Sequence, residues 1–187
     1  MVPPVSLDIQ ANRSMRKWTR REQVGRVLFA CILPLFRLSP RPLWGFRRAI
    51  LRAFGARIGS DVHITPSVAI TIPWNLSVGD RAAVGERAIL YALGPIMIGA
   101  DATISQGAHI CAGTHDFRDP AMPLMKPPIT IGAGAWICAD AFVGPGVSVG
   151  ELAVVGARAV AMRDVEAAAI VVGNPARTVG TRRMDRG

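Results

Sequence analysis

The chain has 187 residues, half of them hydrophobic and 19% charged, a balance that excludes disorder throughout and fits one domain with a modest extension. Aromatic residues make up only 6%, whereas glycine, alanine and valine abound, which suits thin repeated coils better than a large mixed core. The net charge of +9 is uneven, because residues 1–60 carry twelve Lys and Arg against Asp8 and Glu22.

The basic segment is suited to anionic lipid, another polyanion or only water. Nucleic acid is not an expected partner, because no zinc-finger, RRM or basic-zipper pattern accompanies the arginines. The three cysteines, Cys31, Cys111 and Cys138, form no CxxC pair and indicate reduced thiols in the cytoplasm. No signal peptide is expected, since the first twenty residues lack an apolar core.

Residues 1–57 are predicted to form a basic N-terminal arm and capping helices. The arm is loose over 1–17, and helices follow over 18–36 and 41–54. The apolar run 27–36 is too short to cross a membrane, which takes about twenty residues. Both helices are expected either to cap the open end of a repeat fold or to lie on an anionic membrane at its inner face. The apolar face of the first helix comprises Val24, Val27, Leu28, Cys31, Ile32 and Leu35.

Residues 58–187 repeat with a period of six, which fits neither a helix nor an alternating strand. An aliphatic residue recurs every sixth position from Ile131 to Val155, and a small residue follows four places later. This is typical of a hexapeptide parallel β-helix. Three hexads make one turn, so residues eighteen apart should stack, with about five coils over 58–160. Glycines in recurring apolar–Gly pairs are expected at the corners, where they tolerate unusual backbone angles. A loop insertion, 116–128, interrupts the repeat, and a tail, 163–187, closes it.

His115 stands where the insertion breaks the repeat, at a hexad position that should point out of the prism. An imidazole titrates near neutrality and suits general-base chemistry on a hydroxyl or amine, although a lone histidine is usually only a surface residue. His63 and His109 occupy the same hexad position, which raises the alternative of a zinc site. Their spacing disfavours such a site within one chain, but a site shared between subunits stays open.

Several ordered motifs resemble the hexapeptide acyltransferase superfamily, and most closely its colanic-acid-biosynthesis and maltose, galactoside and nodulation O-acetyltransferases. The resemblance covers about residues 40 to 183. The motifs are Arg41-Pro42-Leu43-Trp44-Gly45, Pro73-Trp74-Asn75-Leu76, Ile104-Ser105-Gln106, Gly113-Thr114-His115-Asp116, Pro128-Ile129-Thr130-Ile131-Gly132, Trp136-Ile137 and Val172-Gly173-Asn174-Pro175-Ala176.

The resemblance implies an all-β, left-handed parallel β-helix that forms a homotrimer with active sites between subunits. It implies acetyl-CoA as co-substrate, no metal, and His115 as the base that deprotonates the acceptor hydroxyl. Asn75 would contact the acceptor. Asp116 is a further substrate-side candidate for orienting His115, although side chains of sequence neighbours rarely face one another in an extended chain. The residues expected to hold acetyl-CoA are Trp136, Ala139, Ala157, Arg163 and Arg177.

The sequence therefore predicts an acetyl-CoA-dependent O-acetyltransferase that acts on a sugar or glycan precursor of the exopolysaccharide type. The alternatives are an acyltransferase for another small molecule, such as an antibiotic or amino sugar, a γ-type carbonic anhydrase with zinc, and a β-helix subunit without enzymatic activity.

Overall fold

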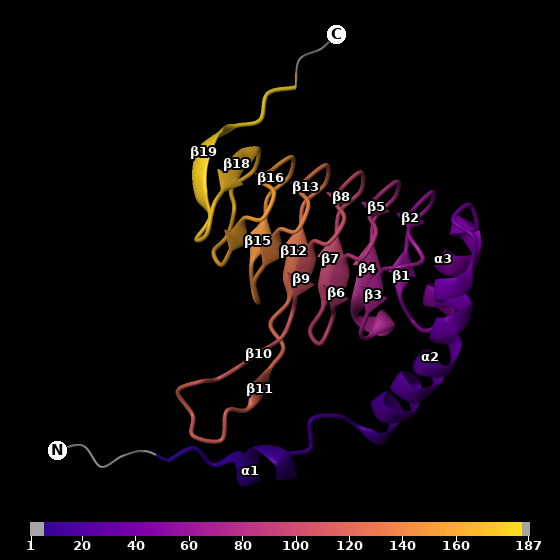
Figure 1. The fold of residues 1–187 in the computed structure, drawn as a ribbon, viewed down its shortest axis with the longest axis vertical. Helices are drawn as coiled ribbons and strands as arrows, with labels where there is room; N and C mark the ends of the chain where they lie inside the picture. Colours follow the sequence, from indigo (N-terminus) through magenta and orange to yellow (C-terminus); the bar gives the residue numbers. More distant parts are fainter. Residues whose placement is uncertain (1–5, 185–187) are drawn as a thin grey trace, which may run out of the picture.

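Residues 6–184 are described by a computed structural model, in which short strands stack into a prism with helices at one end (Figure 1). Three parallel sheets form its sides. Sheet A contains β1 (Arg57–Ile58), β4 (Leu76–Val78), β7 (Ile96–Ile98), β12 (Ile129–Ile131) and β15 (Ser148–Val149). Sheet B contains β2 (His63–Ile64), β5 (Ala83–Val84), β8 (Thr103–Ile104), β13 (Trp136–Ile137), β16 (Val154–Val155), β18 (Ala169–Val172) and β19 (Arg177–Thr181). Sheet C contains β3 (Ala69–Ile70), β6 (Ile89–Tyr91), β9 (His109–Cys111), β14 (Phe142–Val143) and β17 (Val160–Ala161).

The chain visits the sheets in the order A, B, C in coil after coil, which confirms the predicted parallel β-helix. The aliphatic residue of each hexad and the small residue four places later both point inward, as Ile137 and Ala141 do with no exposed surface. These side chains form one continuous core along the prism axis. The alternation of large and small residues lets each thin coil fill its interior.

The stacking distance of eighteen residues is correct only for the later coils. Thr130 pairs with Ser148 at that step, whereas Arg57 pairs with Ser77 and therefore lies twenty residues away. The two extra residues of each early coil lie between sheets C and A, where the 3₁₀ helix η1 (Pro73–Asn75) forms. They explain why the hexad pattern loses phase there in the sequence.

The glycines of the apolar–Gly pairs have a different role from the one expected. A Cβ on Gly79 would lie 2.5 Å from the backbone nitrogen of Ala100 in the next coil. The left-handed backbone angles belong to non-glycine residues two positions after these glycines, such as Arg81 (φ 58°) and Asp101 (φ 59°). Close approach between coils, not an unusual φ, therefore demands glycine at this edge of the prism.

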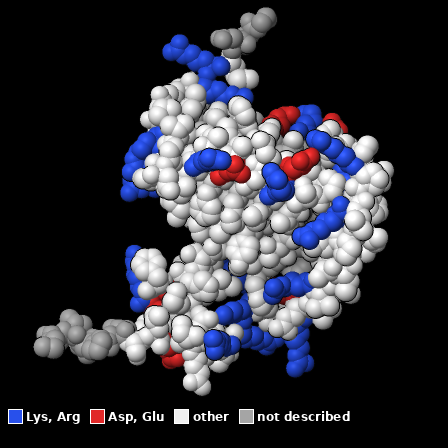
Figure 2. Space-filling model, in the orientation of Figure 1, with Lys and Arg blue, Asp and Glu red and all other residues white. Residues whose placement is uncertain are grey.

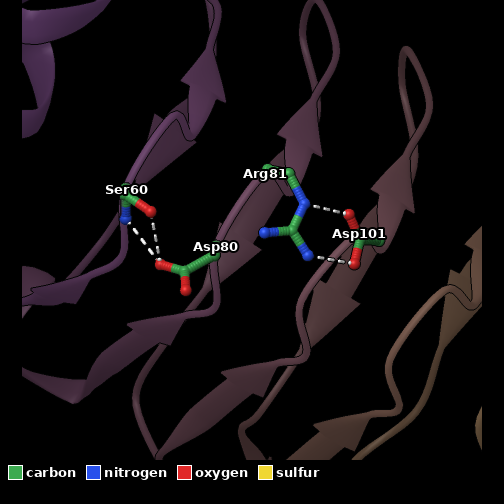
Figure 3. Close-up of polar contacts among 4 residues, drawn as sticks. All are labelled: Ser60, Asp80, Arg81 and Asp101. Atoms are coloured by element: carbon green, nitrogen blue, oxygen red, sulfur yellow. Dashed lines mark hydrogen bonds and ion pairs between the residues drawn. The ribbon is translucent and has the colours of Figure 1, made fainter.

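Polar side chains tie successive coils together along the same edge, between sheets A and B (Figure 3). The backbone N–H and hydroxyl of Ser60 both donate to Asp80 Oδ1, at 2.7 and 2.9 Å. Arg81 donates to both carboxylate oxygens of Asp101 at 2.7 Å. These bonds lower the pKa of both aspartates from the ordinary value.

Three helices precede the prism: α1 (Ile9–Ser14), α2 (Arg20–Leu38) and α3 (Trp44–Ala53). The expectation of a loose arm over 1–17 was wrong for α1, which Asp8 caps by accepting from the backbone N–H of Ala11 at 2.8 Å. No helix within residues 6–184 is long and apolar enough to cross a membrane.

The expected apolar face of α2 was also wrong. Phe29 and Phe36 are the buried side chains, and Ile32 and Leu33 pack partly against the core. Because residues 27–36 of α2 are all apolar, the pattern there does not determine which face docks, and the two phenylalanines are the largest side chains of this run. The remaining residues of the expected face are exposed: Val24, Val27, Leu28, Cys31 and Leu35.

Helix α3 closes the first coil through its arginines. Backbone hydrogen bonds join each coil to the next, as from Gly59 N–H to Val78 O, and the first coil has no preceding coil to pair with the carbonyls on its outer edge. The fully buried Arg47 donates to Ile64 O at 2.6 Å, and Arg52 donates to Ile58 O at 2.9 Å. Part of the N-terminal basic charge thus satisfies the open edge of the β-helix.

Candidate active site

His115 lies on a hairpin that projects from the prism where sheet C would pass into sheet A. Strand β10 (Thr114–His115) pairs antiparallel with β11 (Leu124–Met125), and His115 is opposite Leu124. The hairpin hangs below the prism in Figure 1. The side chain of His115 is exposed, as its position in the hexad predicted.

One nitrogen of the His115 ring is already engaged. Nδ1 lies 2.6 Å from the carbonyl oxygen of Met122, across the hairpin. A carbonyl can only accept, so Nδ1 carries the proton and the lone pair of the neutral ring is on Nε2. The arrangement provides an exposed, oriented base.

Asp116 does not contact the His115 ring. Its carboxylate accepts from the backbone N–H of Arg118 at 3.0 Å, and its own backbone N–H donates to Pro123 O at the same distance. These bonds shape the start of the insertion. The geometry gives Asp116 a role in the loop and no direct role in orienting the ring.

Asn75 lies at the same edge of the prism as His115, two coils earlier. Its amide nitrogen donates to the carbonyls of Ala92 and Leu93 at 3.0 and 2.9 Å. The Leu93 side chain in turn packs so closely on Gly113 that a Cβ there would lie 2.9 Å from it. Both amide hydrogens are therefore used within the chain, and Asn75 can offer a ligand only its carbonyl oxygen.

Trp136 and the two alanines lie along the edge between sheets B and C. Trp136 is 45% exposed, and its Nε1–H donates to Ser105 Oγ at 2.8 Å. Ala139 and Ala157 occupy equivalent positions in successive coils, where Arg158 N donates to Ala139 O at 2.9 Å. Neither alanine N–H donates to another group among residues 6–184. A ligand lying along this edge would find small side chains and free backbone donors.

Arg163 and Arg177 line one cavity of about 490 Å³ at the C-terminal end of the prism. Arg177 opens β19, the antiparallel strand that closes sheet B. The guanidinium of Arg177 donates to the carbonyl of Ala176 at 2.9 Å, and both arginines are exposed. Two basic side chains beside one cavity suit an anionic group such as a phosphate.

A single chain does not bring His115 and the acetyl-CoA candidates together. His115 and Asn75 lie at the edge between sheets C and A, whereas Trp136, Ala139 and Ala157 lie at or near the edge between B and C. The width of sheet C separates them.

The other two histidines have separate surroundings. The ring of His63 stacks on Trp44 at 4.6 Å, and its Nε2 lies 3.3 Å from Asp61. His109 lies on sheet C against Phe142, and burial lowers its pKa. Within residues 6–184, no three His, Cys, Asp or Glu side chains come close enough to share a metal ion.

The cysteines near the site are poor nucleophiles. Burial raises the pKa of Cys138, and it raises the pKa of Cys111 more than the hydrogen bond to Gly113 O lowers it. Neutral thiols react slowly, since the thiolate is the nucleophile.

Asn12 is a further residue near the candidate site, and its side chain reaches the insertion from 110 residues away. No local pattern marks it, because the contact joins two irregular segments that are remote in the sequence. Ser105, which accepts from the indole N–H of Trp136, belongs to the motif Ile104-Ser105-Gln106, and the motif alone assigned it no role.

Comparisons with known proteins give a consistent result, although no family model matches the chain. It is 44% identical over 148 residues to an Escherichia coli K12 protein assigned as a colanic acid biosynthesis acetyltransferase, covering 79% of this chain and 81% of that one. A maltose O-acetyltransferase structure from Clostridium difficile matches with a TM-score of 0.81 at 21% identity, covering 89% of this chain and 90% of that one. A galactoside acetyltransferase in complex with coenzyme A matches with a TM-score of 0.82 at 19% identity, covering 92% and 88%.

Proposed function

This chain belongs to the hexapeptide-repeat acetyltransferases, and we propose that it transfers acetyl from acetyl-CoA to a hydroxyl of a sugar or glycan precursor of the exopolysaccharide type. The relative at 44% identity is assigned to colanic acid biosynthesis, which supports a glycan acceptor. The observation that carries the chemistry is the exposed His115 ring, with Nδ1 on the Met122 carbonyl and Nε2 left as a base.

In the proposed reaction, Nε2 of His115 takes the proton of the acceptor hydroxyl as its oxygen attacks the thioester carbonyl. The tetrahedral intermediate collapses, the C–S bond breaks, and the sulfur of coenzyme A leaves with a proton returned from the imidazolium. The acetyl group passes directly to the acceptor. The raised pKa values of Cys111 and Cys138 support a route without an acyl-enzyme.

Acetyl-CoA would lie along the edge between sheets B and C. Trp136 would flank the pantetheine arm, and the free N–H groups of Ala139 and Ala157 would bind its amide carbonyls. Arg163 and Arg177 would meet the phosphate-bearing end at their shared cavity. On the acceptor side, the Asn75 carbonyl oxygen would accept from a sugar hydroxyl.

The site is proposed to form between subunits of a homotrimer. The separation of His115 from the acetyl-CoA residues supports this assembly, because catalysis needs both within reach. The outer face of sheet C supports it too, since the row Ala69, Ile89, His109, Phe142 and Val160 is almost wholly apolar. Figure 2 shows a hollow between the prism and the segment below it, which leaves room for a neighbour.

The test is thiol release from acetyl-CoA with a panel of sugars and lipid-linked oligosaccharides, and mass spectrometry of the products. His115→Ala should lower turnover by about 10²–10⁴-fold while coenzyme A binding is kept. Turnover that survives the substitution would remove His115 from the mechanism. Acetylation of an antibiotic or amino sugar, but of no glycan, would favour the alternative acceptor class.

A further inference from the structure

The N-terminal arm, residues 8–18, is fastened to the insertion that carries His115. The backbone N–H of Asp8 donates to Pro120 O at 2.8 Å, and Lys126 Nζ donates to Lys17 O at 3.0 Å. The ammonium of Lys126 also lies 3.6 Å from the ring centre of Trp18, and Arg26 lies 4.6 Å from it. The arm thus contacts the hairpin loop near its tip and at the end of β11.

Asn12 makes the contact nearest to the imidazole. Its amide nitrogen donates to the carbonyls of Ala121 and Met122 at 2.7 and 2.6 Å. Its oxygen accepts from Lys17 Nζ at 2.8 Å, which fixes the orientation of the amide. The Met122 carbonyl therefore accepts from both Asn12 and His115 Nδ1, one for each lone pair.

The loop that Asn12 contacts has hydrogen bonds of its own, from Met122 N–H to Asp119 O and from Ala121 N–H to Asp119 Oδ1, both at 2.8 Å, but neither reaches the Met122 carbonyl. The hairpin has only two residue pairs, and Met122 has a left-handed φ of 45° that a side chain rarely adopts. Strained residues persist only where their surroundings hold them. Asn12 supplies a bond at the strained residue itself, beside the carbonyl on which the His115 ring depends.

We propose that Asn12 is a positioning residue for His115. It holds the Met122 carbonyl against Nδ1, so that the imidazole keeps its lone pair on Nε2 and its ring keeps its orientation. This inference rests on the proposed role of His115 as the base. A substitution at Asn12 should leave acetyl-CoA binding unchanged and reduce the rate of proton removal, because misplacing a catalytic group by about 1 Å can cost about 100-fold.

The experiment uses the full chain with Asn12→Asp, which keeps the shape and presents oxygens to both carbonyls, and Asn12→Ala. Gln10→Ala is the matched control, since Gln10 is an exposed residue of α1. We expect kcat to fall by about 10- to 100-fold in both Asn12 variants, with the KM for acetyl-CoA and the melting temperature retained. Gln10→Ala should behave as the wild type.

A second measurement does not depend on turnover. Nitrogen-15 NMR of the imidazoles, assigned with His115→Ala, should show the Nδ1–H tautomer for His115 in the wild type and a mixture in Asn12→Asp. An unchanged tautomer and kcat would overturn the positioning role, and so would a raised KM for the acceptor alone, which would make Asn12 an acceptor contact. If His115→Ala keeps full activity while the tautomer still responds to Asn12, the proposed base is wrong and the structural link stands.

Discussion

At the scale of single residues, the imidazole side chain has opposite surroundings at His115 and at His109. His115 is exposed and oriented by a backbone carbonyl, which suits proton transfer. His109 packs edge-on between Tyr91 and Phe142, and its buried Nε2 has no hydrogen-bond partner among residues 6–184. The same hexad position therefore holds a candidate base at His115 and a histidine packed between aromatic rings at His109.

His109 should make the fold sensitive to acid. Burial lowers its pKa in the folded chain, so the unfolded chain, with a histidine pKa of about 6.5, binds the proton more readily. Stability is therefore unaffected above that pH and falls as the pH drops below about 6.5. His109→Phe should remove this part of the loss, measured by urea unfolding at pH 7.5 and 5.5. His63→Gln is the control, and an equal acid loss in wild type and His109→Phe would contradict the prediction.

At the scale of elements, the hexad pattern sufficed to predict the coils, their inward residues and the break at His115. It did not predict the twenty-residue coils, because the extra residues near η1 lie outside the repeat. It could not choose the docking face of α2, since residues 27–36 are apolar on every side and offer several faces. The hexad pattern could not predict the contact of Asn12 with the insertion, because a repeat period and a local motif describe only residues close together in the sequence.

The basic charge of residues 1–60 suggested anionic lipid, another polyanion or water as its partner, but Arg47 is used inside the fold. Arg47 is buried without an acidic partner, and its donors are used on Ile64 O, Ser39 Oγ and Pro40 O. Desolvation lowers its pKa. The geometry of the first coil, which only the fold reveals, supplies the acceptors.

Arg47→Ala should destabilise the protein strongly, because it leaves buried acceptors unpaired and opens a cavity against the first coil. We expect a loss of about 3 kcal/mol or more in the free energy of unfolding, measured with urea. Arg57→Ala on the exposed side of β1 is the matched control and should stay within about 0.5 kcal/mol. Equal losses in the two variants would show that the cap adds nothing.

At the scale of the whole molecule, the proposed site is divided between two edges of the prism. Neither edge carries a complete set of the proposed residues, although each is well formed. Two inactive variants with defects at different edges should therefore complement each other in one assembly.

Co-expression of His115→Ala with Ala157→Trp, which blocks the edge between sheets B and C, tests this division. Random mixing places an intact histidine beside an intact acetyl-CoA edge in about one quarter of contacts, so about a quarter of wild-type activity is expected. Each variant alone should be inactive. No recovery in verified mixed trimers would mean that one chain carries the complete site.

Contact with an anionic membrane stays a prediction. The outward side of α2 presents Leu38, which is 83% exposed, and Leu35, with Arg20 and Arg37 at its ends. Figure 2 shows several basic side chains gathered below the prism. The protein should sediment with phosphatidylglycerol vesicles at low salt and less at high salt. Leu35→Asp should weaken this binding, whereas Val179→Asp on β19 should not. Vesicle binding that is unchanged by both substitutions would refute the role of α2.

The direction of the backbone ladder also makes the two ends of the prism unlike. The first coil has no coil before it, and β18 has no parallel strand after it, so the two ends present opposite edges of the parallel ladder. Bare ends of this kind would join head to tail, and every joint would leave the same two ends for the next copy, so a filament would grow without limit. Arg47 and Arg52 occupy one end, and β19 covers the other by pairing in the opposite direction. The caps therefore act as terminators of polymerisation, and they confine the β-helix to a single molecule.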